Sequence, residues 1–248
     1  MDLTNLPFVS TLLDLTYTGL MALTTLLDPV AGALSAALAV LLVTLVVRAA
    51  LIPAGVAQAK AEQVRARLAP RLRELQQRHR ANPERLQRET MQLYRSEGAS
   101  PFAGCLPMLI QAPIVGLLYS VFLHAMIAGH PNALLAQTLL GVPLGTSLAG
   151  AIATGAADPQ TWMVIGCLVL AIAAMGELTR RLFRVEPLGG SANGGAPGIP
   201  GGLLGMLQFA TAVVAVFVPL AAGLYLLTTV TWTLCQRLVL RRVYPPTL

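Results

Sequence analysis

Polar residues are rare in the apolar parts of this chain, and one apolar segment contains a single arginine. Arg48 is the only charged residue between Pro29 and Pro53. An arginine at the centre of a bilayer costs about 2.5–3.5 kcal/mol on insertion scales. Arg48 therefore either reaches the lipid headgroups with its long side chain or faces a hydrated site, where its charge would attract an acidic ligand. The residues alone leave both interpretations open.

Other polar side chains in apolar segments are candidates for the same site. Gln111 lies between Pro107 and Pro113, and a buried glutamine needs partners, so an interhelical hydrogen bond and a place in a polar groove are both open. Thr44 falls one helical turn before Arg48, where it either lines the site or bonds within its own helix. Weaker candidates are Gln58, Tyr225, Thr228, Thr229 and Trp232. For the tryptophan, anchoring at the membrane interface is an equal alternative.

Bond-making chemistry has no support in the sequence. It contains no nucleophile–base pair, phosphate-binding loop, zincin motif or carboxylate dyad. Cys105, Cys167 and Cys235 lie far apart in apolar runs without C-x-x-C spacing, so we expect small buried thiols and neither a disulfide nor a zinc site. We predict no catalytic residue, no metal and no cofactor.

The composition indicates a membrane protein. Of the 248 residues, 55% are hydrophobic and only 11% are charged, whereas a soluble domain has about 25% charged residues. The 17 Lys and Arg residues fall at Arg48 and in three blocks, 60–95, 180–184 and 237–242. Segments 1–47 and 96–179 contain none, which is typical of spans that obey the positive-inside rule. The basic balance thus indicates topology, and we predict no recognition of a specific nucleic-acid sequence.

These patterns predict an all-α integral membrane protein, a five-span helical bundle with a cytoplasmic helical hairpin and an N-terminal interfacial helix. The expected segments are 1–28, an external interfacial amphipathic helix; 29–53, the first span; 54–100, the hairpin; 101–127, the second span; 128–159, an external connection; 160–178, the third span; 179–202, a cytoplasmic Gly/Pro linker; 203–240, the fourth and fifth spans; and 241–248, a cytoplasmic tail.

Several boundaries follow from local signals. Asp28-Pro29 is expected to break the first helical pattern, and Pro53 to end the first span. Asn82-Pro83 supplies a cap and a first-turn proline for the second hairpin helix. Segment 133–157 is apolar and long enough that a sixth span stays open. The first residues have no positive region and contain Asp2, so we expect no cleaved signal.

Three motifs occur in order in the first half of the chain. They are TLVVRAALIP at 44–53, LAPRLRELQQRH at 68–79 and NPERLQRETMQLYRSEGASPFAGCLPMLIQAPIVGLLYSVF at 82–122. This run resembles the YidC-type insertase family, which has mitochondrial and chloroplast relatives. The last span agrees more loosely, through Pro219, Tyr225, Trp232 and Gln236. Leu226 stands where the family usually has a tryptophan, and Ala221 where it has a glycine.

The resemblance implies a membrane protein insertase or chaperone. Such a protein passes client transmembrane segments into the bilayer through a hydrophilic groove open to cytoplasm and lipid, and Arg48 matches the family's single groove arginine. Implied partners are nascent membrane proteins, together with the ribosome, signal recognition machinery, the Sec translocon and anionic lipids. We expect a multi-pass protein of the bacterial plasma (inner) membrane, with its N-terminus outside and its C-terminus in the cytoplasm. A small transporter or channel and a non-insertase assembly scaffold are the alternatives.

Overall fold

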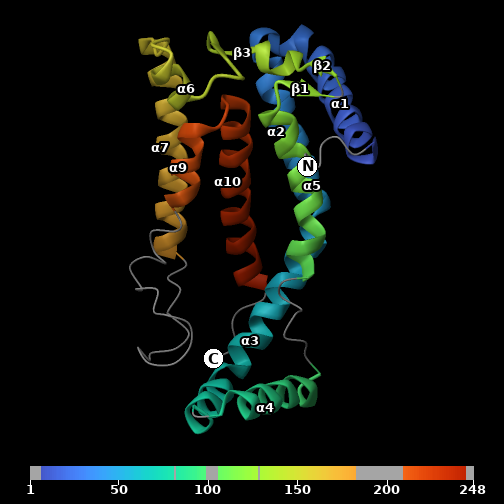
Figure 1. The fold of residues 1–248 in the computed structure, drawn as a ribbon, viewed down its shortest axis with the longest axis vertical. Helices are drawn as coiled ribbons and strands as arrows, with labels where there is room; N and C mark the ends of the chain where they lie inside the picture. The colour runs from blue at the N-terminus through green and yellow to red at the C-terminus, as the bar shows by residue number, and fades with distance from the viewer. Residues whose placement is uncertain (1–6, 81, 99–105, 128, 183–208, 244–248) are drawn as a thin grey trace.

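The computed structural model describes residues 7–80, 82–98, 106–127, 129–182 and 209–243, and most of them are helical (Figure 1). The helices are α1 (Pro7–Ala31), α2 (Ser35–Ala50), α3 (Ile52–Arg78), α4 (Pro83–Ser96), α5 (Leu106–Leu123), α6 (Leu148–Ala153), α7 (Pro159–Leu182), α9 (Ala210–Phe217) and α10 (Leu220–Val243). Two 3-10 turns, η2 (Gly32–Leu34) and η3 (Ala133–Ala136), join them.

In the described part of the chain, two helical stretches are long and apolar enough to cross a bilayer. They are Phe8–Ala50, which comprises α1 and α2, and Pro159–Leu182, which is α7. Ala112–Leu123 is a shorter apolar helix. The prediction of an all-α membrane protein is confirmed at the level of fold class.

The break expected at Asp28-Pro29 lies slightly later in the structure. Helix α1 continues through Pro29 to Ala31, and the chain turns at η2, where Gly32 has φ 50°. Glycine takes a positive φ without the steric cost of a side chain, so the reversal falls there. After it, α1 packs against α2 (Figure 1).

Segment 124–158 forms a compact cap. Strand β1 (Met126–Ile127) pairs antiparallel with β2 (His130–Pro131), and β3 (Thr138–Leu139) pairs with β4 (Val142–Pro143). These turns leave no continuous helix in 133–157, so the sixth-span alternative is wrong. The cap also caps the start of α10. The N–H groups of Leu220 and Ala221, which have no partner within the helix, donate to the carbonyls of Thr146 and Leu144, both at 2.9 Å.

A polar contact ties this cap to α1. The His130 ring Nε2 lies 2.9 Å from Asp14 Oδ1, and the His130 ring lies 5.1 Å from that of Tyr17. The Ala133 N–H donates to Tyr17 Oη at 3.2 Å. The hydrogen bond with Asp14 raises the pKa of His130 above its ordinary value.

Among the described residues, the buried apolar core occupies one half of the bundle. It draws on α2 up to Val40, on α5 from Leu118, on α7 from Val164 to Ile172, and on α10 up to Tyr225. We call this region, next to the cap, the packed half. The hairpin-side half consists of α2 after Val40, α5 before Leu118, α7 after Ile172 and α10 after Tyr225. Among its described side chains, only Thr44 and Leu234 are buried.

Helices α3 and α4 extend away from the packed half and fold back on each other (Figure 1). Arg71 Nη1 lies 2.6 Å from Glu97 Oε1 near one end of the pair, and His79 Nε2 lies 2.8 Å from Glu89 Oε2 at the other. The predicted cap is confirmed, because Asn82 Oδ1 accepts a hydrogen bond from the Arg85 N–H at 3.0 Å and Pro83 opens α4. The Arg85 side chain also donates to Glu89 and lowers the pKa of that carboxyl.

The expectation of buried thiols is wrong for the two cysteines that the structure describes. Cys167 on α7 and Cys235 on α10 are free and exposed. Large apolar side chains on α7 are exposed as well, for example Leu170 at 70%. In a membrane bundle, lipid rather than protein can cover such surfaces, so an apolar segment does not imply burial. Cys105 lies outside the described residues.

Candidate functional site

The eight candidate residues lie on four helices. Thr44 and Arg48 are on α2 and Gln58 is on α3. Gln111 is on α5, where its side chain lies outside the described part. The other four, Tyr225, Thr228, Thr229 and Trp232, are on α10. Helix α10 packs against α2, α5 and α3, so it is the element that brings the candidates together.

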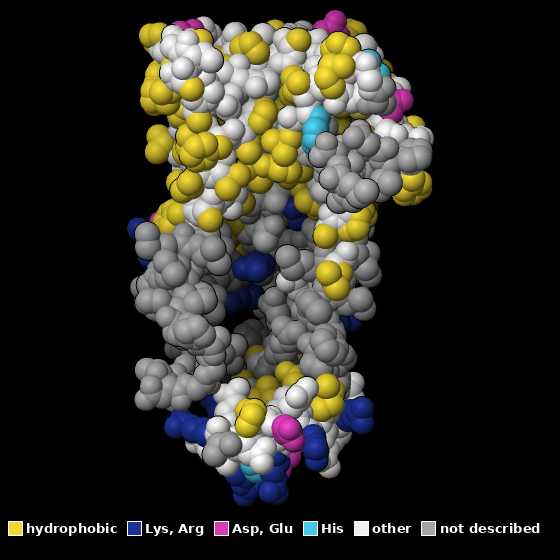
Figure 2. Space-filling model, viewed as in Figure 1, with side chains coloured by type: hydrophobic (Ala, Val, Ile, Leu, Met, Phe, Trp, Pro, Cys, Tyr) yellow, Lys and Arg dark blue, Asp and Glu magenta, His cyan; other side chains and the backbone are white. Residues whose placement is uncertain are grey.

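Arg48 lies in the last turn of α2, in the hairpin-side half, and its side chain is half-buried. A cation at this end complements the helix dipole. Within the described residues Arg48 has neither a hydrogen bond nor an ion pair, so no described carboxylate neutralises its charge. Figure 2 shows basic side chains midway between the apolar upper part of the molecule and the charged α3–α4 pair.

Thr44 has a different environment from Arg48, although it lies one turn earlier. Its side chain is 1% exposed, and its hydroxyl donates to the Val40 carbonyl at 2.6 Å. The alternative of a bond within its own helix is therefore the arrangement in the structure. Thr44 marks the side of α2 that packs on its neighbours.

Two hydroxyl groups on α10 are buried without a hydrogen-bond partner among the described residues. They are Tyr225 Oη and Thr229 Oγ1, one helical turn apart. The Tyr225 ring packs 5.9 Å from Phe122 and 6.0 Å from Tyr119, which holds the phenol at the end of the packed half. A buried hydroxyl without a partner costs about 1–3 kcal/mol, so water or a ligand is the natural partner for each.

The remaining candidates have partners or partial exposure. The Thr228 hydroxyl donates to Leu224 O at 2.8 Å, and the Trp232 indole N–H donates to Gln236 Oε1 at 3.0 Å. Gln58 is half-buried on α3. Every residue from Leu226 to Thr233 is half-buried, which makes this stretch of α10 a boundary between the protein and its surroundings.

Sequence reasoning missed one contact near this site. The amide of Gln236 lies against the backbone of α3 at Gly55, where no side chain intervenes. The four-residue spacing of Trp232 and Gln236 on α10 was the available signal, since such residues meet on one helix face. Nothing in the sequence indicated Gly55.

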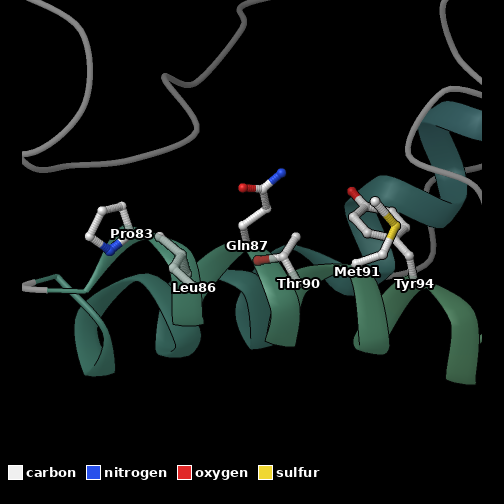
Figure 3. Close-up of a pocket in the computed structure, with 6 residues that line it drawn as sticks. All are labelled: Pro83, Leu86, Gln87, Thr90, Met91 and Tyr94. Atoms are coloured by element: carbon white, nitrogen blue, oxygen red, sulfur yellow. The ribbon is translucent and has the colours of Figure 1, made fainter.

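A shallow, mostly apolar pocket lies on the surface of α4, away from all eight candidates (Figure 3). It is lined by Pro83, Leu86, Gln87, Thr90, Met91 and Tyr94. The close-up shows these side chains along a single helix. The pocket is open and formed by one helix face, so it provides no enclosed site for a small ligand. Within the described ranges, no group of three His, Cys, Asp or Glu side chains could hold a metal ion.

Comparison with known proteins connects these features to one family. Residues 26–247 match the family described as 60Kd inner membrane protein. Three curated relatives are each named membrane protein insertase YidC. The protein of Clostridium perfringens is 41% identical over 83 residues, or 34% of this chain and 35% of the relative. The protein of Granulibacter bethesdensis is 43% identical over 83 residues, which are 34% of this chain and 14% of the relative. The protein of Oceanobacillus iheyensis is 37% identical over 91 residues, which are 35% of this chain and 36% of the relative.

The aligned region therefore spans at most about a third of these relatives' length, whereas the family match extends over most of this chain. The three relatives are bacterial, and the family is one of inner membrane proteins. From the match over residues 26–247, the chain belongs to the 60Kd inner membrane protein family.

Proposed function

We propose that this protein is a membrane protein insertase that passes client transmembrane segments through a hydrophilic groove open to cytoplasm and lipid. One observation supports this most directly: among the described side chains, the fully buried apolar core lies in the packed half of the bundle. Arg48 and the unpartnered Thr229 hydroxyl lie beyond the end of that core, in the hairpin-side half. The names of the relatives support the same function.

The groove would act physically rather than by bond-making. A charged side chain that crosses hydrocarbon costs about 2.5–3.5 kcal/mol on insertion scales, and each polar group of a client tail adds to the barrier. Water held between α2, α5 and α10 would shorten the hydrocarbon path. The positive charge of Arg48 would hold an acidic tail for a time before its release. Gln111, Gln58, Thr228 and Trp232 are proposed as the other groove residues on these helices and α3.

The proposed topology has five spans, an external N-terminus and a cytoplasmic C-terminus. The absence of Lys and Arg from 1–47 and 96–179 supports it. In this topology the α3–α4 pair is cytoplasmic, with net positive charge. It could thus meet nascent membrane proteins, the ribosome, signal recognition machinery or the Sec translocon, and each basic side chain near an anionic leaflet would contribute about 1 kcal/mol.

Reconstitution tests the function. Purified full-length protein in liposomes should insert a translocon-independent client, measured by protease protection of its translocated tail, while empty liposomes should not. A solute-flux assay on the same vesicles should give no signal above the empty control. Flux without insertion would favour a transporter or channel. Activity in neither assay would favour an assembly scaffold and contradict the proposal.

A further inference from the structure

Helix α10 and helix α3 meet at a contact with no side chain on one side. A Cβ atom placed on Gly55 would overlap Gln236 Nε2 and lie 2.9 Å from Gln236 Cδ. The amide of Gln236 thus fills the space that the Cβ atom of any other residue at 55 would occupy. Glycine weakens a helix relative to alanine. A side chain at position 55, however, would displace the Gln236 amide from its place against α3.

The Gln236 amide is held in one orientation. The Trp232 indole N–H, which can only donate, bonds to Gln236 Oε1 at 3.0 Å. The carbonyl end of the amide is therefore directed at Trp232, and the Nε2 end is left toward Gly55. Because Trp232 precedes Gln236 by one turn of α10, this pair presents the amide from a single rigid element.

Gly55 lies next to the junction between α2 and α3. Helix α2 ends at Ala50, and Leu51, with φ −88° and ψ 3°, separates it from α3. Pro53 follows in the first turn of α3 and has no N–H to continue the hydrogen-bond ladder of α2. The Gly55 N–H donates to Leu51 O at 3.2 Å. Such a break allows the two helices to change their angle unless a contact from outside fixes it.

We propose that Gln236 is a positioning residue that fixes the angle between α2 and α3. The Gln236 amide lies against Gly55 and is oriented by Trp232. It connects α10, which carries the Tyr225 and Thr229 hydroxyls, to the first turn of α3, at the start of the α3–α4 pair. The pair is thereby held at a set position below the groove that Arg48 would line. This role rests on the proposed insertase function, since it explains how a client-receiving element is aligned with the client path.

Variation in this angle changes the distance between α3 and the bundle, which can be measured in the full-length protein in lipid nanodiscs. Native cysteines are replaced by serine, and spin labels are attached at Gln76→Cys on α3 and Leu178→Cys on α7, both at exposed positions. Pulsed electron paramagnetic resonance then gives the distance distribution between α3 and the bundle. We expect Gly55→Ala, Gln236→Met and Trp232→Phe each to widen this distribution about twofold, as expected for a released hinge.

The double variant shows whether Gly55→Ala and Gln236→Met widen the distribution by removing one shared contact or by two independent effects. Gly55→Ala with Gln236→Met should be no wider than either variant alone, because both remove the same contact. The matched control is Gly166→Ala on α7, where an added Cβ meets no atom within 4 Å and the distribution should keep its wild-type width. Gln236→Met keeps the length of the side chain and serves if Gly55→Ala does not fold.

A wild-type distribution in both Gly55→Ala and Gln236→Met would overturn the positioning role, and so would additive widening in the double variant. The measurement needs no client. Widened distributions in a protein that inserts nothing would support the role of Gln236 and contradict the insertase proposal, so the two failures are distinguishable.

Discussion

At the scale of single residues, Arg48 places a positive charge in the hairpin-side half without a described carboxylate beside it. If this charge attracts client tails, Arg48→Lys should keep most of the insertion activity, while Arg48→Ala and Arg48→Glu should lose about tenfold, equivalent to about 1.4 kcal/mol. The loss should concentrate on clients whose translocated tails contain Asp or Glu. Protease protection in proteoliposomes measures it, with a tail lacking charge as the matched control. Equal losses for both tails would argue against an electrostatic role.

The hydroxyls of Tyr225 and Thr229 test whether the groove is hydrated. In a dry interior, each unpartnered hydroxyl destabilises the fold by about 1–3 kcal/mol, so Tyr225→Phe and Thr229→Val would raise stability. We expect no such gain, with changes below about 0.5 kcal/mol, because groove water already satisfies both groups. Unfolding in detergent micelles measures the difference. A clear stabilisation by both variants would mean that this region is dry.

At the scale of elements, the contact between α1 and the cap should depend on pH. The hydrogen bond with Asp14 raises the pKa of His130, so the folded state binds the proton more tightly than the unfolded chain. The resulting stabilisation is fully present below the ordinary histidine pKa of about 6.5 and is lost as pH rises through the raised value. Hydrogen exchange of α1, corrected for intrinsic rates, should thus be slower at pH about 6 than at about 8.5.

The matched variant for this prediction is Asp14→Asn, which keeps the shape of the side chain but removes its charge. It should flatten the pH dependence of exchange in α1 while leaving α7 unchanged. An unaltered pH profile in this variant would show that another group controls the attachment of α1.

The elements differ in how far the sequence could predict them. Helices with strong caps, such as α4 after Asn82-Pro83, were predictable because local groups specify their ends. The two-residue strands of the cap were not, because they are too short for a repeating pattern and are fixed by Gly turns and contacts with α1 and α10. The orientation of Thr44 depends on which face of α2 packs against its neighbours, which an almost uniformly apolar segment does not reveal.

The candidate site was predictable in part for a related reason. A lone charge in an apolar segment is visible in any sequence, so Arg48 stands out without a structure. The seat of Gln236 on Gly55 depends on the crossing of α3 and α10, which lie far apart in the chain. The spacing of residues within one helix does not reveal a contact between two helices that are far apart in the sequence.

At the scale of the whole molecule, the proposed topology predicts which surfaces meet the outside. A cysteine at Leu140 in the cap, 59% exposed, should react with a membrane-impermeant thiol reagent added to intact cells expressing a variant without native cysteines. A cysteine at Gln76 on α3 should react only after the cells are opened. If position 76 alone reacts in intact cells, the protein has the opposite orientation. If positions 76 and 140 both react in intact cells, the protein inserts in both orientations.

The restriction of the core to the packed half has a consequence for how the protein tolerates change. Truncating Phe122 to alanine there should cost about 3–5 kcal/mol, whereas comparable truncations in the hairpin-side half should cost far less, because few described side chains are buried there. We therefore expect the packed half to be rigid and the hairpin-side half to be more compliant. In the proposed insertase, this compliance would let the hairpin-side half accommodate client segments of different width without disturbing the buried core among the described residues.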